Sequence, residues 1–197
     1  MVEVRRATPD DVEAAVEVLT AAFVWSPFIR HLVAADDHER RVRETQRLFL
    51  THVGLAHGAV WVTDDRDAVA VWTTPETDAA AAFGPIVEQV ADLAGEQAAA
   101  AARTEQLLGP HRPTEPVWFL GSVAVRPDRQ GRGLGTAVIS PGLAAADAAG
   151  SPAYLETSTD RNVRLYRRLG FEVTTEVRLP DGAPPVWCMN RSPRTTG

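Results

Sequence analysis

Glycines and arginines alternate with other residues between Arg129 and Thr136, in the run Arg-Gln-Gly-Arg-Gly-Leu-Gly-Thr. The run follows the apolar residues 117–125 and precedes an alanine-rich stretch, so it lies where a strand gives way to a helix. Closely spaced glycines let the backbone turn until successive N–H groups point at one spot, and the positive end of the helix dipole adds to them. The run therefore predicts a loop that binds phosphate groups.

The spacing of the glycines excludes two common phosphate loops. A dinucleotide fingerprint needs G-x-G-x-x-G, but Thr136 or Val138 stands where the third glycine is required. A P-loop needs G-K-[ST], and the chain contains no lysine. The pattern that remains is Q-x-x-G-x-G, formed by Gln130, Gly133 and Gly135.

A tyrosine lies downstream in the segment Leu-Tyr-Arg-Arg-Leu-Gly-Phe, residues 165–171. Leu165 and Leu169 are spaced to face the core of a short helix, which turns Tyr166 about 100° away from them. This predicts a phenol that points into a cleft. The alternative is a boundary tyrosine with a packed ring and a hydrated hydroxyl.

Hydrophobic patterning predicts the elements that would position these residues. A strand is expected at residues 2–6, then a helix capped by Thr8 that ends near residues 25–27, with a loop at Pro27. Residues 39–53 favour a second helix, and residues 59–63 and 68–74 an antiparallel hairpin. Residues 77–108 favour helix with a break at Gly84-Pro85, and residues 117–125 a central strand covered on both faces.

The C-terminal part continues in the same way. The helix that starts near Gly133 is expected to kink or break around Pro141. A strand at 153–157, a helix at 160–169 and strands at 172–179 and 186–190 follow. The whole chain, residues 1–197, is therefore expected to be one α/β domain.

Composition narrows the function. The apolar share of 45% and the charged share of 23% fit a globular protein, and a net charge of −6 speaks against nucleic-acid binding. The single cysteine, Cys188, and the absence of metal-ligand spacing among the five histidines argue against a disulfide and a metal site. No apolar stretch is long enough to span a membrane and no secretory signal is visible, so a cytoplasmic protein is expected.

The glycine pattern and the Tyr166 segment resemble, in the same order, two signatures of the GNAT superfamily of N-acetyltransferases. The resemblance implies an α/β (α+β) fold with a mixed, mostly antiparallel sheet of about six to seven strands flanked by helices. It also implies acetyl-CoA in a cleft between two splayed parallel central strands, with Tyr166 as the general acid that protonates the CoA thiolate. The implied coenzyme contacts are Val123, Ala124, Val125, Gln130, Gly131, Arg132, Gly133, Leu134, Gly135, Thr136 and Asn162.

Several of these roles have structural alternatives. Glu156, at the end of strand 153–157, is either a general base for the acceptor amine, as in some GNAT enzymes, or a half-exposed strand carboxylate. Asn162 is either a coenzyme contact or simply the start of a helix. Arg126, Arg129 and Arg132 could each meet the coenzyme's phosphates or lie solvated at the surface, and Arg132 is favoured.

Further segments resemble the puromycin N-acetyltransferases of actinomycetes, in the same order along the chain: residues 71–76, 110–113, 118–120, 154–158 and 187–189. This resemblance implies that acetyl passes to the free amine of puromycin, which gives antibiotic resistance. Candidates for the acceptor site are Trp25, Ser26, Phe28 and Phe119.

One departure leaves the acceptor open. Before Pro27 that family carries an acidic residue and a tyrosine, where this chain has Trp25 and Ser26. Another small aminoacyl or aromatic amine is therefore the alternative acceptor. A non-catalytic acyl-CoA-binding module is the alternative from another class, although Tyr166 argues against it. A protein acetyltransferase would need an open cleft, whereas residues 77–108 suggest a lid over a small acceptor.

Overall fold

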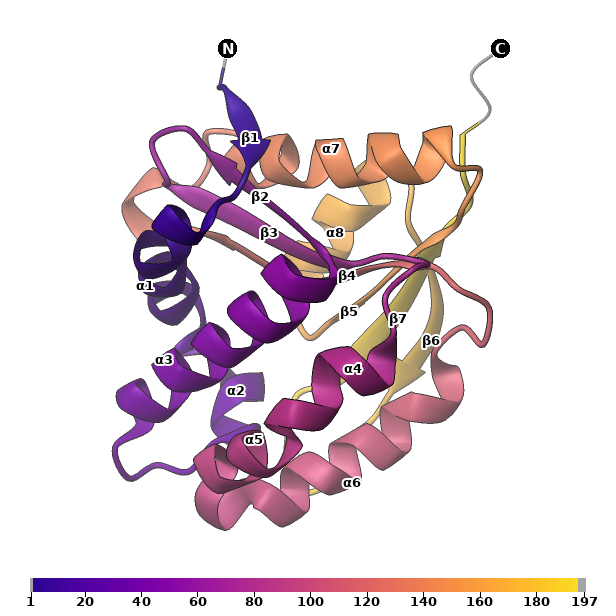
Figure 1. Ribbon diagram of the computed structural model, residues 1–197. Coiled ribbons are helices and arrows are strands. Elements are labelled where there is room, and N and C mark those ends of the chain that lie inside the picture. Colours follow the sequence, from indigo (N-terminus) through magenta and orange to yellow (C-terminus); the bar gives the residue numbers. More distant parts are fainter. Residues whose placement is uncertain (1, 195–197) are drawn as a thin grey trace.

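A seven-stranded sheet with helices on both faces makes up the computed structural model, which describes residues 2–194 (Figure 1). In spatial order the strands are β1 (Val4–Arg6), β2 (Ala59–Thr63), β3 (Ala68–Thr73), β4 (Trp118–Val125), β5 (Ala153–Thr157), β7 (Val186–Arg191) and β6 (Glu172–Val177). Only β4 and β5 pair in parallel, and every other neighbouring pair is antiparallel. The mixed, mostly antiparallel sheet and the 59–63/68–74 hairpin are thus confirmed.

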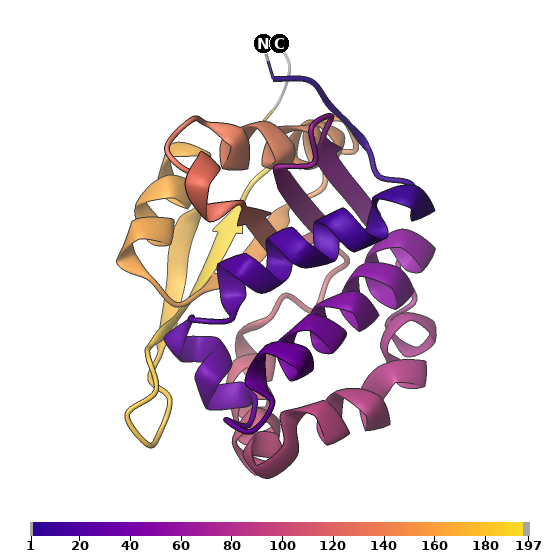
Figure 2. The same ribbon diagram turned by 90° about the vertical axis from the view of Figure 1, so that its left-hand side faces the viewer.

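The N-terminal helices cover one face of the sheet. A 3₁₀ turn, η1 (Pro9–Asp11), leads into α1 (Val12–Phe23), and the Thr8 N–H donates to the Asp11 carboxylate at 2.9 Å. The valines and alanines of α1 pack on the apolar side chains of β2 and β3 that point to this face. Helix α3 (His38–Leu48) lies beside α1 and continues as the π-helical turn η2 (Phe49–Leu55), as expected for residues 39–53 (Figure 2).

The loop expected at Pro27 is instead the first turn of a helix. Helix α2 (Pro27–Leu32) begins there, with Ser26 as its N-cap. Proline suits this place because the first helical N–H has no intrahelical acceptor and the proline ring already holds the helical φ angle. The expectation of a loop was therefore wrong by one short helix.

Residues 77–108 form a row of short helices below the sheet (Figure 1). These are α4 (Ala79–Phe83), α5 (Val87–Ala94) and α6 (Ala98–Leu108). The expected break at Gly84-Pro85 is present, and a second break occurs at Gly95, whose φ of 59° belongs to the left-handed region. Helix α5 packs against α3, and α6 packs against α2.

Two helices cover the other face, α7 (Leu134–Ala148) and α8 (Asp160–Arg168). Of the kink or break expected near Pro141, the break is absent, because α7 runs through the proline. Val138, Ile139, Leu143 and Ala146 are buried on both sides of it, so packing on the sheet outweighs the lost backbone hydrogen bond. No helix within residues 2–194 combines the length and the apolar character needed to cross a bilayer.

A close contact between α7 and the sheet explains the residue that follows Pro141. A Cβ atom added to Gly142 would stand 2.5 Å from Cε2 of Trp72, whose side chain is fully buried in β3. Only glycine therefore lets the helix approach the indole so closely.

We predict that Gly142→Ala lowers the free energy of unfolding by about 1–3 kcal/mol, because overpacking a full core outweighs the better helix propensity of alanine. Urea denaturation measures the change. Gly109→Ala is the matched control, since no atom lies within 4 Å of the added Cβ. Equal stability of the two variants would contradict the role of the contact with Trp72.

Candidate functional site

The two parallel strands of the sheet diverge at its centre. β4 and β5 pair only from Trp118–Leu120 against Ala153–Leu155, and Gly121 lies where the β3–β4 register shifts. Beyond this point β4 pairs with β3 alone, and Glu156 and Thr157 pair with β7 alone. The edge of β4 that faces β5 is therefore open to an extended ligand chain, which could add to it as another strand would.

β4 is the central strand, as predicted, and it is covered on both faces, by α1 and by α7. Near the divergence the cover is incomplete, because Gly121 is exposed and Val123 and Val125 are only half-buried. Separation from β5 uncovers this part of the strand. Of the three residues predicted to contact the coenzyme here, only Ala124 is buried.

The predicted phosphate loop lies between β4 and α7. It follows a 3₁₀ turn, η6 (Pro127–Arg129), and Gly131 and Gly133 have φ angles of 78° and 81°, in the left-handed region that favours glycine. Gly133 is the N-cap of α7, so the N–H groups of Leu134 and Gly135 belong to the first turn and have no intrahelical acceptor. The loop is thus built as an anion-binding helix N-terminus.

The start of α8 lies beside this loop (Figure 2). Nη1 of Arg161 is 3.4 Å from Oε1 of Gln130, and Asn162 stands in the first turn of α8. The Asn162 N–H donates to the Oγ1 of the N-cap Thr159 at 3.3 Å. The structure therefore brings Asn162 and Gln130 to the same region, as a shared coenzyme site requires.

A buried carboxylate holds two of the three candidate arginines. Asp67, in the β2–β3 turn, is 3% exposed, and its carboxylate is 3.3 Å from Nη1 of Arg126 and 3.0 Å from Nε of Arg129. The Arg126 N–H also donates to the Asp67 carbonyl at 2.9 Å. Within residues 2–194 Arg132 forms no ion pair and its side chain is exposed, so it is the arginine that can turn to a ligand without breaking one.

Asp67 is not among the residues predicted from the sequence. Residues 67 and 126 meet because Ala68 pairs with Val125 in the β3–β4 register. A hairpin turn with three aspartates, Asp64, Asp65 and Asp67, was the only signal, and no spacing connects it to the loop.

Tyr166 faces the core, contrary to the sequence-based expectation. Val163 and Tyr166 are the buried residues of α8, whereas Leu165 and Leu169 are only half-buried. The Tyr166 ring packs edge-on against Phe171, with 5.9 Å between the ring centroids. Burial alone raises the pKa of the Tyr166 phenol above its ordinary value, so the hydroxyl keeps its proton.

Two side chains donate three hydrogen bonds to Glu156. Nε and Nη2 of Arg112 donate to its two oxygens at 2.7 and 3.0 Å, and the Tyr154 hydroxyl donates to Oε1 at 2.9 Å. The Glu156 side chain is 14% exposed. It is therefore more buried than the half-exposed strand carboxylate that was the alternative to a general base. Burial alone would lower the pKa of Arg112, but the carboxylates of Glu156 and Glu105 raise it well above its ordinary value. Glu156 therefore faces a guanidinium that stays charged.

Tyr166 and Glu156 lie on opposite faces of the sheet. Side chains alternate along a strand, so Leu155 and Glu156 point in opposite directions. Leu155 belongs to the same apolar cluster as Tyr166, and Tyr154 belongs to a different cluster on the other face. A ligand between the strands would have the phenol on one side and the carboxylate on the other.

The four predicted acceptor residues separate into two places. Phe28 and Phe119 join the cluster of Tyr154, and the rings of Phe119 and Tyr154 meet edge-on at 5.1 Å. Trp25 is 73% exposed, with the Arg30 guanidinium 4.9 Å from its ring centroid. Ser26, the N-cap of α2, forms no side-chain capping bond. The structure thus brings together two of the four, on the Glu156 face of the sheet.

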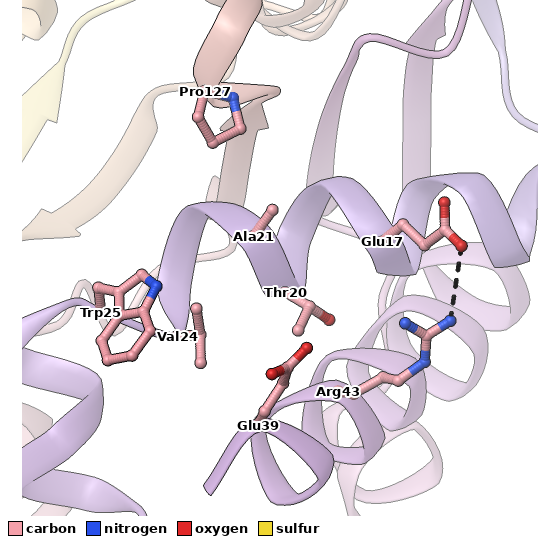
Figure 3. Close-up of a pocket in the computed structure, with 8 residues that line it drawn as sticks. All are labelled: Glu17, Thr20, Ala21, Val24, Trp25, Glu39, Arg43 and Pro127. Atoms are coloured by element: carbon pink, nitrogen blue, oxygen red, sulfur yellow. Dashed lines mark ion pairs between the residues drawn. The ribbon is translucent and has the colours of Figure 1, made fainter.

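Trp25 lines an open surface groove of about 610 Å³ instead. Figure 3 shows α1 crossing this groove, with Pro127 on one side and Glu39 and Arg43 of α3 on the other. The Arg43 guanidinium lies 3.9 Å from Glu17. Within residues 2–194 no three His, Cys, Asp or Glu side chains are grouped as metal ligands.

Comparisons with known proteins connect this geometry to one family. A family model described as Acetyltransferase (GNAT) family matches residues 56–171, which include the phosphate loop and Tyr166 but not residues 25–28. A solved structure from Corynebacterium glutamicum, named histone acetyltransferase HPA2 and related acetyltransferase, is 27% identical. The alignment covers 99% of this chain and 98% of that chain, with a TM-score of 0.77.

More distant solved structures share the fold. Arylalkylamine N-acetyltransferase 2 from Aedes aegypti is 11% identical over 98% of this chain and 99% of that chain, with a TM-score of 0.62. The polyamine N-acetyltransferase of Drosophila melanogaster is 14% identical over 98% of this chain and 100% of that chain, with a TM-score of 0.58. The whole length of the chain is therefore covered by one known architecture.

We predict that Asp67→Asn weakens acetyl-CoA binding about fivefold and lowers the free energy of unfolding by about 1–2 kcal/mol, because both arginines lose their buried counter-ion and the loop loses its anchor. Calorimetric titration and urea denaturation measure the two effects. Asp128→Asn is the matched control, since this carboxylate pairs with Arg126 at the exposed surface. If both variants bound acetyl-CoA as the unchanged protein does, Asp67 would not be the anchor.

Proposed function

Because the chain belongs to the GNAT family of acetyltransferases, we propose that it moves the acetyl group of acetyl-CoA to the free amine of puromycin. Acetyl-CoA-dependent N-acetyl transfer is the activity of the family, and acetyl-CoA is its co-substrate. The observation that best supports this proposal is the divergence of β4 and β5. A glycine loop lies beyond the end of β4, and the Glu156 carboxylate lies near the end of β5.

In this proposal the coenzyme would lie along the open edge of β4. Its pantetheine arm would pair with the backbone of Val123, Ala124 and Val125, and its pyrophosphate would lie on the loop amides of residues 130–136. Arg132 and Asn162 would contact the phosphates, since Arg126 and Arg129 already pair with Asp67. This pose brings the thioester to the point where the strands separate.

The reaction is a direct attack. The amine nitrogen forms a bond to the thioester carbonyl carbon, and backbone N–H groups near Val123 stabilise the oxyanion. Glu156, directly or through water, takes the proton of the acceptor ammonium before the attack. When the C–S bond breaks, the Tyr166 hydroxyl gives its proton to the thiolate, and the proton released from the acetylated nitrogen returns through water to the phenolate. Burial raises the pKa of the Tyr166 phenol, which keeps the group protonated before the transfer but also makes it a weaker acid.

The acceptor would lie on the Glu156 face. Phe28 and Phe119 supply an aromatic wall for the methoxyphenyl ring of puromycin. Tyr154 belongs to the same cluster, and its hydroxyl donates a hydrogen bond to the Glu156 carboxylate. Support for puromycin itself comes from the chain-long resemblance of residues 71–76, 110–113, 118–120, 154–158 and 187–189. Trp25 lies apart in the groove lined by α1 and α3 and is not part of this acceptor site, and residues 25 and 26 are where this chain departs from that resemblance.

We expect Tyr166→Phe to lower kcat about 100-fold or more, the usual effect of removing a general acid. Stability should change by less than about 0.5 kcal/mol, because the ring stays and burial, not a hydrogen bond, governs the hydroxyl. Since the phenol pKa is raised, this group should produce no loss of rate below about pH 10. A full rate in the variant would exclude Tyr166 as the acid.

The named acceptor is tested by a panel of amines. We expect turnover of acetyl-CoA with puromycin, followed as released thiol, and none with puromycin whose amine is already acetylated. A panel of other aminoacyl and aromatic amines serves as the comparison. Faster turnover of one of these than of puromycin would retain the transferase chemistry and replace the acceptor.

A further inference from the structure

A chain of charged and polar groups joins helix α6 to the end of β5. Arg112, just after the 3₁₀ turn η5 (Gly109–His111), donates from Nη1 to Glu105 of α6 at 2.7 Å and from Nε to Glu156 of β5 at 2.7 Å. Its Nη2 reaches both carboxylates, at 3.2 and 3.0 Å. The guanidinium carbon also lies 5.8 Å from the ring centroid of Phe119. The Arg112 side chain thus contacts helix α6, Phe119 and the Glu156 carboxylate.

We propose that Arg112 is a positioning residue, which holds Glu156 in place for the ammonium group of the acceptor, and that the net negative cluster it forms with Glu105 and Glu156 selects against acceptors with a free carboxylate beside the amine. The inference rests on the proposed N-acetyl transfer on the Glu156 face. The resemblance and the family match assign no role to Arg112.

The hydrogen bonds of Glu156 leave one position open. Oε1 accepts from Nε of Arg112 and from the Tyr154 hydroxyl, whereas Oε2 accepts only from Nη2 of Arg112. A carboxylate oxygen has room for two donors, so Oε2 retains one acceptor position. Because the other three positions hold the carboxylate still, the free one has a set direction. An ammonium N–H is the donor that suits it.

The charges of Glu105, Glu156 and Arg112 determine which groups can stand next to the amine of the acceptor. Glu105 and Glu156 carry two negative charges and Arg112 one positive charge, so the cluster is net negative and attracts a cation. Four of the five N–H groups of Arg112 already bind carboxylates, which leaves no bidentate site for another. A free amino acid would place its carboxylate against Glu156, whereas an amide or ester would not.

The first test compares two acceptors in the unchanged protein, O-methyltyrosine amide and free O-methyltyrosine. We expect the amide to be acetylated with a kcat/KM at least about tenfold higher, as expected when a like charge is brought to the site. Equal values would overturn the proposed selection against carboxylates. A protein that acetylates neither, but acetylates another amine of the panel, is tested with that amine and its carboxylated analogue.

The second test removes the arginine. We expect Arg112→Gln to raise the KM of the acceptor about tenfold, with the KM of acetyl-CoA unchanged within about twofold, because one charge-assisted hydrogen-bond pair is lost on the acceptor face only. Arg112→Lys should recover part of the loss, since it restores the charge without the fork. Arg103→Gln, which removes an exposed pair of α6 with Asp181, is the matched control.

The assignment to Glu156 is tested by a double-mutant cycle. In a Glu156→Gln background, Arg112→Gln should cause no further rise in the KM of the acceptor, because the group that it positions is gone. An independent rise, or an equal rise for acetyl-CoA, would mean that Arg112 only supports the fold. These outcomes concern Arg112, whereas loss of turnover with every amine in the unchanged protein would reject the proposed function itself.

Discussion

The short parallel pairing of β4 and β5 is the constraint on which the site depends. Three residue pairs join the strands, and beyond Leu120 and Leu155 each keeps only its antiparallel neighbour. β3 and β7 hold the two strands in the sheet while their facing edges separate. An unpaired strand edge normally invites association with another chain, and here it lies at the centre of the sheet, where only a narrow extended molecule can reach it.

The segments that follow β4 and β5 in the chain determine which residues lie near the divergence of the two strands. The glycine loop follows β4 after the 3₁₀ turn η6, and Glu156 lies one residue from the end of β5. Helix α8, which follows β5, packs on the opposite face of the sheet from Glu156 and places Tyr166 in the core. Helices α5 and α6, from residues 77–108, pack against α3 and α2. Arg112 links α6 to β5, because it binds both Glu105 and Glu156. The loop and Glu156 thus lie near the ends of the two diverging strands, and Tyr166 lies in the core on the opposite face of the sheet from Glu156.

Arginine forks connect distant parts of the molecule. Buried or half-buried pairs join Arg112 to Glu156 and Arg191 to Asp147, each across 44 residues, and Asp67 binds two arginines next to the loop. A guanidinium can bind two carboxylates or both oxygens of one, which a single ammonium cannot do in the same geometry. The chain has no lysine, so arginine forms these links. Arg112 fixes the carboxylate of Glu156, and Asp67 fixes Arg126 and Arg129 next to the glycine loop.

Local patterns determined most of the elements and the candidate loop. Valine alternation, the Thr8 cap, the Gly84-Pro85 break and the glycine spacing depend on neighbours in the chain, and so the sheet, its hairpin and the helix after the loop could be predicted. Patterns failed where packing competed with propensity: α7 passes Pro141 because its sides are buried, and Tyr166 turns inward because Val163 and the ring share the buried face. Only the tertiary structure decided that Arg112 binds Glu156, that Asp67 holds Arg126 and Arg129, and that Trp25 lies apart from Phe28 and Phe119. Such partners are set by strand register and helix packing between residues far apart in sequence, which no local spacing records.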